Sequence, residues 1–298
     1  MSSPVSTGEL AALLCALLWA VNGMLLRAQA DRIPPTSVTV VRCAVAALMF
    51  WLLLPFSDSL TELGRVPWGE WGLLLASVMA GIGVGDTLYL IAIKQIGLSL
   101  TMALAGVFPL TTLVWEWLLL GRPPGWSLAV GSVLVVAGVV LMSRSGDRRS
   151  ATLAASPQHL QRGLALALGA AVFWGLASVL LKPAIAHLSL LQANAARMTM
   201  VAALLYALRV LPQGRQGLGT YDRRSFLIVS LTGILGMGVG AYLFLYALGH
   251  MGVAKAVTLT SSAPLFGVAL GMAFLHERLT PAAGLGVACC MVGVWVVL

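Results

Sequence analysis

The sequence predicts an all-α integral membrane protein whose ten transmembrane helices form two inverted five-helix repeats. Three observations lead to this fold class. The 298 residues are 59% hydrophobic and only 9% charged, whereas a soluble domain carries roughly 25% charged residues. Ten apolar stretches follow one another along the chain, and a shift of 155 positions brings the second half of the chain into register with the first.

The first half of the chain contains five apolar stretches of the length needed to cross a bilayer, which is ~20 residues. These stretches cover residues 9–28, 36–55, 70–93, 99–120 and 125–143. Helix-breaking residues separate them at Pro34-Pro35, Pro67 and Pro123-Pro124-Gly125. The first stretch does not resemble a cleaved signal peptide, because no Lys or Arg precedes it and Glu9 lies at its start. We therefore assign residues 1–143 to a first five-helix repeat.

The second half repeats this pattern after a polar segment. Residues 144–161 are rich in Ser, Arg and Ala and predict a linker, and residues 162–298 form the second repeat. Its five apolar stretches cover residues 163–182, 190–210, 225–248, 254–275 and 281–298, with breaks marked by Pro212 and Pro281.

The internal repeat extends through both halves without a gap. Tryptophan, arginine, proline and glycine all recur at the same shift, in the pairs Gly8/Gly163, Trp19/Trp174, Arg42/Arg197, Gly81/Gly236, Gly83/Gly238, Gly85/Gly240, Pro109/Pro264, Gly131/Gly286 and Gly138/Gly293. Each half contains five helices, an odd number, so the second half must cross the membrane in the opposite sense. Inverted repeats of this kind are typical of secondary transporters, in which the substrate binds near the midplane where the repeats meet.

Charge sets an expected orientation. When residues at the ends of the apolar stretches are counted with the adjoining loop, the odd-numbered loops hold twelve Lys and Arg and the even-numbered loops hold four. By the positive-inside rule the odd loops are therefore cytoplasmic and both termini lie outside. The formal net charge is +8, but the basic residues are scattered along the chain rather than gathered in one patch, which argues against nucleic-acid binding. The composition fits a bacterial inner membrane.

The repeated residues resemble those of the drug/metabolite transporter superfamily, specifically its EamA-type members. The resemblance covers about 8–143 and 163–298 and rests on Trp19, Trp174, Arg42, Arg197, Pro109, Pro264 and the sequence Glu277-Arg278-Leu279-Thr280. The first half departs from the pattern with Arg122-Pro123-Pro124 in the corresponding loop. The resemblance implies a ten-helix transporter, commonly an exporter of amino acids or other metabolites. It also implies a central cavity lined by the first, third and fourth helices of each half, with the fifth and tenth helices peripheral.

Asp86 is the first candidate site residue. It lies near the middle of the third apolar stretch, where a charge costs roughly 2.5 to 3.5 kcal/mol on insertion scales. Its repeat mate is Ala241, so the shared fold does not require the carboxylate. Asp86 would carry a coupling proton or bind a substrate ammonium group. The alternative is a structural ion pair or hydrogen-bond acceptor.

Aromatic and polar pairs at helical spacing supply further candidates for substrate binding. Trp19 with Asn22 and Trp174 with Ser178 each share a helix face, as do Asp86 with Tyr89 and Tyr242 with Tyr246. Such rings and hydroxyls could line one cavity. Ordinary helix packing, with each polar group bonded to a backbone carbonyl, is the alternative for all of them.

Four repeated residues are candidates for coupling or gating. Arg42 and Arg197 lie inside their helices, where arginine faces protein or water, and structural hydrogen bonding is their alternative role. Pro109 and Pro264 are expected in mid-helix, where proline frees carbonyls and produces a bend. Glu116, near the end of the fourth stretch, is expected to be solvated or ion-paired at the interface.

The motifs of a membrane enzyme are missing from the sequence. There is no HExxH and no GxSxG, and the four cysteines have no metal-ligand spacing. We therefore expect no enzyme activity, no cofactor and no metal. The expected partners are a small-molecule substrate and the lipid bilayer, and the expected assembly is a monomer. The sequence thus predicts a secondary transporter that exports a small metabolite, with amino acids as the first candidates, by alternating access that is either proton-coupled or facilitative. A multidrug exporter of cationic compounds with the same fold is the alternative.

Overall fold

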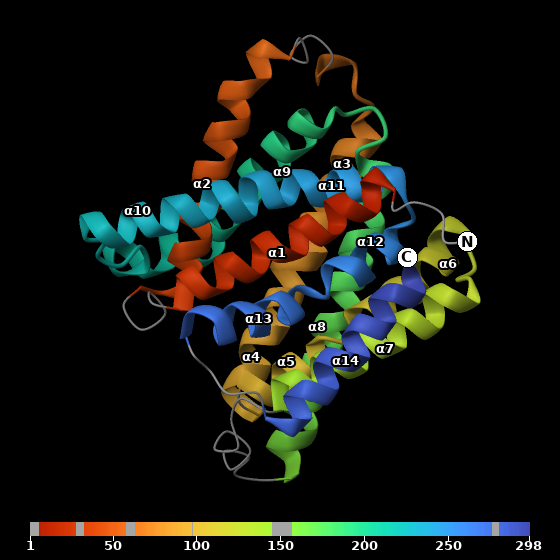
Figure 1. Cartoon of the computed structure of the whole chain (residues 1–298). Helices are drawn as coiled ribbons and strands as arrows, with labels where there is room; N and C mark the ends of the chain where they lie inside the picture. The colour runs from red at the N-terminus through yellow and green to blue at the C-terminus, as the bar shows by residue number, and fades with distance from the viewer. Residues whose placement is uncertain (1–5, 28–32, 58–62, 97, 145–156, 276–279) are drawn as a thin grey trace.

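The computed structural model describes residues 6–27, 33–57, 63–96, 98–144, 157–275 and 280–298. In these residues the regular secondary structure is helical and there is no strand (Figure 1). Six helical segments are long and apolar enough to cross a membrane, and three further apolar helices are shorter. The protein is therefore a multi-pass, all-α membrane protein, and the count of ten crossings stays a prediction.

Helices occupy all ten predicted stretches. The first half of the chain folds into α1 (Thr7–Arg27), α2 (Pro35–Leu53), α3 (Trp68–Val78), α4 (Asp86–Ile96), α5 (Leu98–Ala105), α6 (Phe108–Leu120) and α7 (Trp126–Arg144). The second half folds into α8 (Pro157–Ala184), α9 (Leu190–Leu205), α10 (Arg223–Thr232), α11 (Ala241–His250), α12 (Val253–Thr260), α13 (Ala263–Leu275) and α14 (Pro281–Val297). Most of the predicted linker, 145–156, lies outside the described residues, so the repeat boundaries stay predictions.

Two continuous helical segments, one from α3 to α4 and one from α10 to α11, each contain a π-helical segment at the centre. η3 (Met79–Gly85) joins α3 to α4, and η7 (Gly233–Gly240) joins α10 to α11. The two segments are related by the 155-residue shift and contain the two glycine runs. A π-helical turn is wider than an α-helical turn and is frequent at functional sites. The sequence showed these glycines as repeat pairs and gave no sign of the π geometry.

The fourth and ninth predicted helices are each broken by a two-residue turn. Residues 106–107 separate α5 from α6, and residues 261–262 separate α12 from α13. Pro109 and Pro264 follow these turns as the second residues of α6 and α13. The expectation that both prolines lie in mid-helix is wrong, because each lies in the first turn of a new helix. The N–H groups of a first turn have no intrahelical partner, so the missing N–H of proline costs no hydrogen bond there, and the fixed φ angle of proline suits a helix.

The packing repeats between the halves. α1 packs against α11 and α13, and its counterpart α8 packs against α4 and α6. α2 packs against its own counterpart α9. The buried apolar residues form a large cluster shared by α1, α3, α8, α9, α11 and α12, and a second cluster centred on α2 and α9. The centre of the bundle is therefore built by both halves in equivalent ways.

α7 and α14 form a close antiparallel pair at the side of the bundle (Figure 1). A Cβ atom on Gly138 would lie 2.5 Å from the carbonyl oxygen of Gly286, and one on Gly131 would lie 2.8 Å from that of Gly293. The sequence numbers rise along one helix as they fall along the other, so the two helices run in opposite directions. Small residues let the backbones approach this closely.

Candidate functional site

A cavity of about 400 Å³ lies at the centre of the bundle. Its wall includes residues from α1, α2, η3, α4, α8, α9, η7 and α11. Five pairs of lining residues are related by the 155-residue shift, namely Trp19/Trp174, Cys43/Met198, Gly81/Gly236, Ile82/Met237 and Asp86/Ala241. The cavity therefore lies on the boundary between the two halves, and both π-helical segments contribute to its wall.

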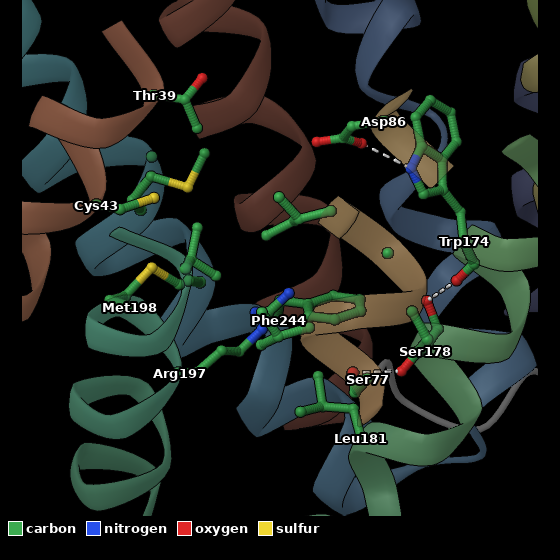
Figure 2. A pocket seen from close by; sticks show the side chains of 18 of the residues that line it. Thr39, Cys43, Ser77, Asp86, Trp174, Ser178, Leu181, Arg197, Met198 and Phe244 are labelled. Atoms are coloured by element: carbon green, nitrogen blue, oxygen red, sulfur yellow. Dashed lines mark hydrogen bonds between the residues drawn. The ribbon is translucent and has the colours of Figure 1, made fainter. Parts of the chain in front are cut away.

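One side of the cavity is formed around Trp174 on α8. The indole Nε1 donates a hydrogen bond to Asp86 Oδ1 at 2.8 Å, and the two side chains point toward each other (Figure 2). The ring centroid of Tyr89 lies 5.1 Å from that of Trp174, and Phe108 meets the same ring edge-on at 6.1 Å. A Cβ atom on Gly85 would lie only 2.7 Å from the indole, so this position needs glycine for the ring to fit.

The other half repeats this arrangement around Trp19 on α1. The ring centroid of Phe244, the repeat mate of Tyr89, lies 5.7 Å from that of Trp19. Gly240, the mate of Gly85, lies against the indole, since a Cβ atom there would be 3.0 Å from Nε1. Ala241 stands in place of Asp86, and the Trp19 Nε1 donates instead to the carbonyl oxygen of Gly236, at 3.3 Å. The two halves of the site share their packing and differ in one carboxylate.

The charged side chains in the described lining of the cavity are Asp86 and Arg197. Most of the remaining wall is apolar or aromatic, including Trp19, Phe108, Trp174 and Phe244. The hydroxyls of Ser77 and Ser178 donate to the carbonyl oxygens of Ala177, at 2.7 Å, and Trp174, at 2.9 Å. Each hydroxyl oxygen still has acceptor capacity. The cavity thus presents an anion, a cation and two polar acceptors in apolar surroundings.

The structure brings five of the predicted site residues to the cavity wall: Trp19, Asp86, Trp174, Ser178 and Arg197. Three others lie close behind it. Tyr89 packs on Trp174, while Asn22 and Arg42 both lie beside Gly236. Asn22 is only 3% exposed, and neither polar atom of its amide has a hydrogen-bond partner in the structure. Pro109 and Pro264 are not among the lining residues.

Tyr242 and Tyr246 are not among the lining residues either, and their predicted role in substrate binding stays a prediction. The two side chains have different surroundings. Tyr246 stacks on His250, with ring centroids 3.9 Å apart, and its hydroxyl donates to Thr7 Oγ1 at 3.3 Å. Tyr242 packs against the cluster between α2 and α9. The aromatic residue that α11 contributes to the cavity is Phe244, which the 155-residue shift from Tyr89 would have found.

Polar contacts join the two halves at the end of the bundle where α1 begins. Glu9 pairs with Lys255, and Glu70 pairs with the side chain of His187 and accepts from its backbone amide at 3.2 Å. Glu116 is buried, and its two carboxylate oxygens accept from the amides of Val253 at 2.9 Å and Ala254 at 2.7 Å. The expectation that Glu116 is solvated or ion-paired at the interface is wrong, because the start of α12 covers the carboxylate.

Near the end of the bundle where α2 begins, a smaller polar contact joins the halves. Ser37 donates to the carbonyl oxygen of Leu218, and its hydroxyl oxygen lies 2.8 Å from that of Tyr221. Burial raises the pKa of Tyr221, and the hydrogen bond with Ser37 acts in the opposite direction. Ion pairs between carboxylates and basic groups thus characterise the first of these ends, and a hydroxyl cluster is found at the second.

Comparison with known proteins places this architecture in a family. The sequence matches the model of the EamA-like transporter family, part of the drug/metabolite transporter superfamily, over residues 6–144 and 161–298. Two similar proteins of Bacillus subtilis (strain 168) are both named uncharacterized transporters. YvbV is 23% identical over 267 residues, which is 89% of this chain and 82% of YvbV. YwfM is 26% identical over 295 residues, which is 96% of this chain and 91% of YwfM.

A solved crystal structure has the same fold. It superimposes with a TM-score of 0.80 and 19% sequence identity, covering 97% of this chain and 95% of the other. The structural match covers nearly the whole chain, and the family match covers both halves that enclose the cavity. The chain belongs to the EamA-like transporter family and is a membrane transporter rather than an enzyme.

Proposed function

We propose that the protein is a secondary transporter that exports amino acids by alternating access. In this proposal ten helices cross a bacterial inner membrane as two inverted five-helix halves, with the odd-numbered loops in the cytoplasm, and the transporter works as a monomer. The observation that carries the proposal is the cavity between the halves, which combines one carboxylate and one guanidinium with aromatic walls.

The charges of the cavity match those of an amino acid. Asp86 offers a partner to the substrate ammonium group, and Arg197 offers donors to the substrate carboxylate. The aromatic walls formed by Trp19 and Phe244 would surround an apolar side chain. A volume of about 400 Å³ is within the usual range of ligand pockets, roughly 300–1,000 Å³. An apolar or aromatic amino acid fulfils all of these conditions.

The position of the cavity supports alternating access. Because both halves supply equivalent parts of its wall, a tilt of one half against the other would open the cavity toward one membrane face and close it toward the other. The ion pairs where α1 begins join the halves at one end and would have to separate when that end opens. Asp86 is the group that would carry a proton if export is coupled to a proton gradient. Without such coupling, transport is facilitative.

Export of cationic drugs is the second candidate function. Asp86 and the aromatic rings would suit an organic cation. Arg197 lines the same cavity, however, and its guanidinium repels a cation that carries no carboxylate. We therefore place amino acids first.

Reconstituted protein provides the test. Proteoliposomes loaded with unlabelled amino acid are given the labelled form outside, with and without a pH gradient, across a panel of amino acids, their decarboxylated amines and cationic dyes. We expect exchange of apolar or aromatic amino acids above empty liposomes. We also expect a loss of at least about tenfold in Asp86→Asn and in Arg197→Gln, with Gly284→Ala, which has open space for the added methyl group, as the control. Exchange of amines alone would favour the drug exporter, and no exchange of any compound would refute both functions.

A further inference from the structure

We propose that Trp174 is the positioning residue of Asp86, because its indole N–H holds the carboxylate in one orientation at the cavity wall. This inference rests on the proposed function only in treating Asp86 as the group that meets the substrate. The contact itself is the 2.8 Å hydrogen bond from Trp174 Nε1 to Asp86 Oδ1 (Figure 2).

The internal repeat separates this role from ordinary packing. Trp19 occupies the same place in the other half, against Gly240 and Phe244, as Trp174 does against Gly85 and Tyr89. Trp19 keeps this position with no carboxylate beside it, since Ala241 stands where Asp86 would be. The packing of the ring therefore does not need an acidic partner. The bond to Asp86 is an addition made in one half only.

The indole is a rigid donor. Gly85 packs so closely on the indole that a Cβ atom at this position would lie 2.7 Å from the ring. Tyr89 and Phe108 also contact the ring. The ring therefore cannot follow the carboxylate if the carboxylate turns. The indole stays in place, and its N–H fixes the orientation of the carboxylate. Binding groups held in advance lose less freedom when the substrate arrives.

The perturbation must separate the indole from the other titratable and charged groups of the cavity. Arg197 on α9 and Cys43 on α2 line the same cavity, and Tyr89 lies one helical turn further along α4. Removing the N–H while keeping an aromatic ring is therefore the specific perturbation. Trp174→Phe provides it, and Trp19→Phe removes an N–H of the same kind that donates to a backbone carbonyl.

The first experiment observes the pair directly. Protein labelled with ¹⁵N-tryptophan gives nine indole N–H signals, of which two are assigned by their loss in Trp174→Phe and Trp19→Phe. We expect Asp86→Asn to move the Trp174 signal and to leave the Trp19 signal in place. We also expect the Trp174 signal of the unmodified protein to shift as Asp86 titrates. If Asp86→Asn moves neither signal, or both equally, the proposal is overturned.

The second experiment measures transport. We expect Trp174→Phe to raise KM for the amino acid by about tenfold, with a smaller effect on kcat. An unchanged KM in Trp174→Phe would contradict the positioning role. If the indole signals behave as expected while Asp86→Asn transports normally, the pairing stands and the proposed function fails.

Discussion

Gly138 and Gly286 face each other so closely that neither has room for a methyl group. A Cβ atom on Gly138 would lie 2.5 Å from the Gly286 carbonyl oxygen, and one on Gly286 would lie 2.7 Å from the Gly138 carbonyl oxygen. The reciprocal contact joins the last helix of each half. The atom that each Cβ would meet is a backbone oxygen, which cannot turn aside as a flexible side chain can.

Alanine at position 138 is therefore expected to separate α7 from α14 and to destabilise the protein by about 1–3 kcal/mol, the usual cost of overpacking. Thermal unfolding in detergent measures the effect. The matched control is Gly284→Ala in α14, where a Cβ atom would meet nothing within 4 Å. Alanine in that open helical position should be neutral or stabilising by up to about 1 kcal/mol. Equal unfolding temperatures for the two variants would show that the helices move apart without cost.

Glu116 is expected to be a structural residue. Its carboxylate satisfies the first two backbone amides of α12, and Glu116→Ala would leave both buried without an acceptor, at about 1–3 kcal/mol for each. Glu116→Gln keeps one acceptor oxygen, so its unfolding temperature should lie between those of the alanine variant and the unmodified protein. Leu118→Ala, two residues further along α6 and 63% exposed, is the control and should change little. An alanine variant as stable as the control would show that the two amides find other acceptors.

The contact between Glu9 and Lys255 is expected to break during transport. The pair joins the start of α1 to the start of α12, so cysteines placed at both positions and joined by a short bifunctional thiol reagent should stop exchange. Cleavage of the linker by reduction should restore exchange. Each single cysteine variant treated with the same reagent is the control. Full activity in the linked protein would mean that these helices stay together through the cycle.

Asn22 is expected to lower the stability of the fold. Its amide is buried and has no hydrogen-bond partner in the structure, and burying an unpartnered amide costs about 1–3 kcal/mol. Its repeat mate is Ala177, which packs beside Gly81 in the same way as Asn22 packs beside Gly236. We therefore expect Asn22→Ala to raise the unfolding temperature. A lower unfolding temperature would show that the amide is bonded within the membrane.

Much of the fold could be predicted from the sequence because its signals are local or repeated. Apolar stretches and breakers placed helices in all ten predicted stretches, and the 155-residue shift paired Trp19 with Trp174. Charge in an apolar setting identified Asp86 and Arg197, both of which line the cavity. These inferences needed no knowledge of how distant segments pack together.

The features that escaped prediction depend on distant contacts or on backbone detail. The partners of Glu116 are 137 and 138 residues away in sequence. The glycine run at 236–240 is equally compatible with an α-helix and with the π-helical segment that forms there. Hydroxyl groups drew attention to Tyr242 and Tyr246, whereas the position that faces the cavity between them carries Phe244. The packing of the neighbouring helices decides which face of α11 lines the cavity.

The exchange of Asp86 for Ala241 between the halves has a consequence for how such a molecule can be assembled. A homodimer of two identical five-helix chains in opposite orientations would carry the same residue at both positions, so its cavity would have either two carboxylates or none. Two carboxylates in one apolar cavity repel, and one of them would be driven to its neutral form. When the halves are joined in a single chain, equivalent positions can carry different residues. A cavity with a single carboxylate is therefore possible for the fused molecule and impossible for a symmetric homodimer.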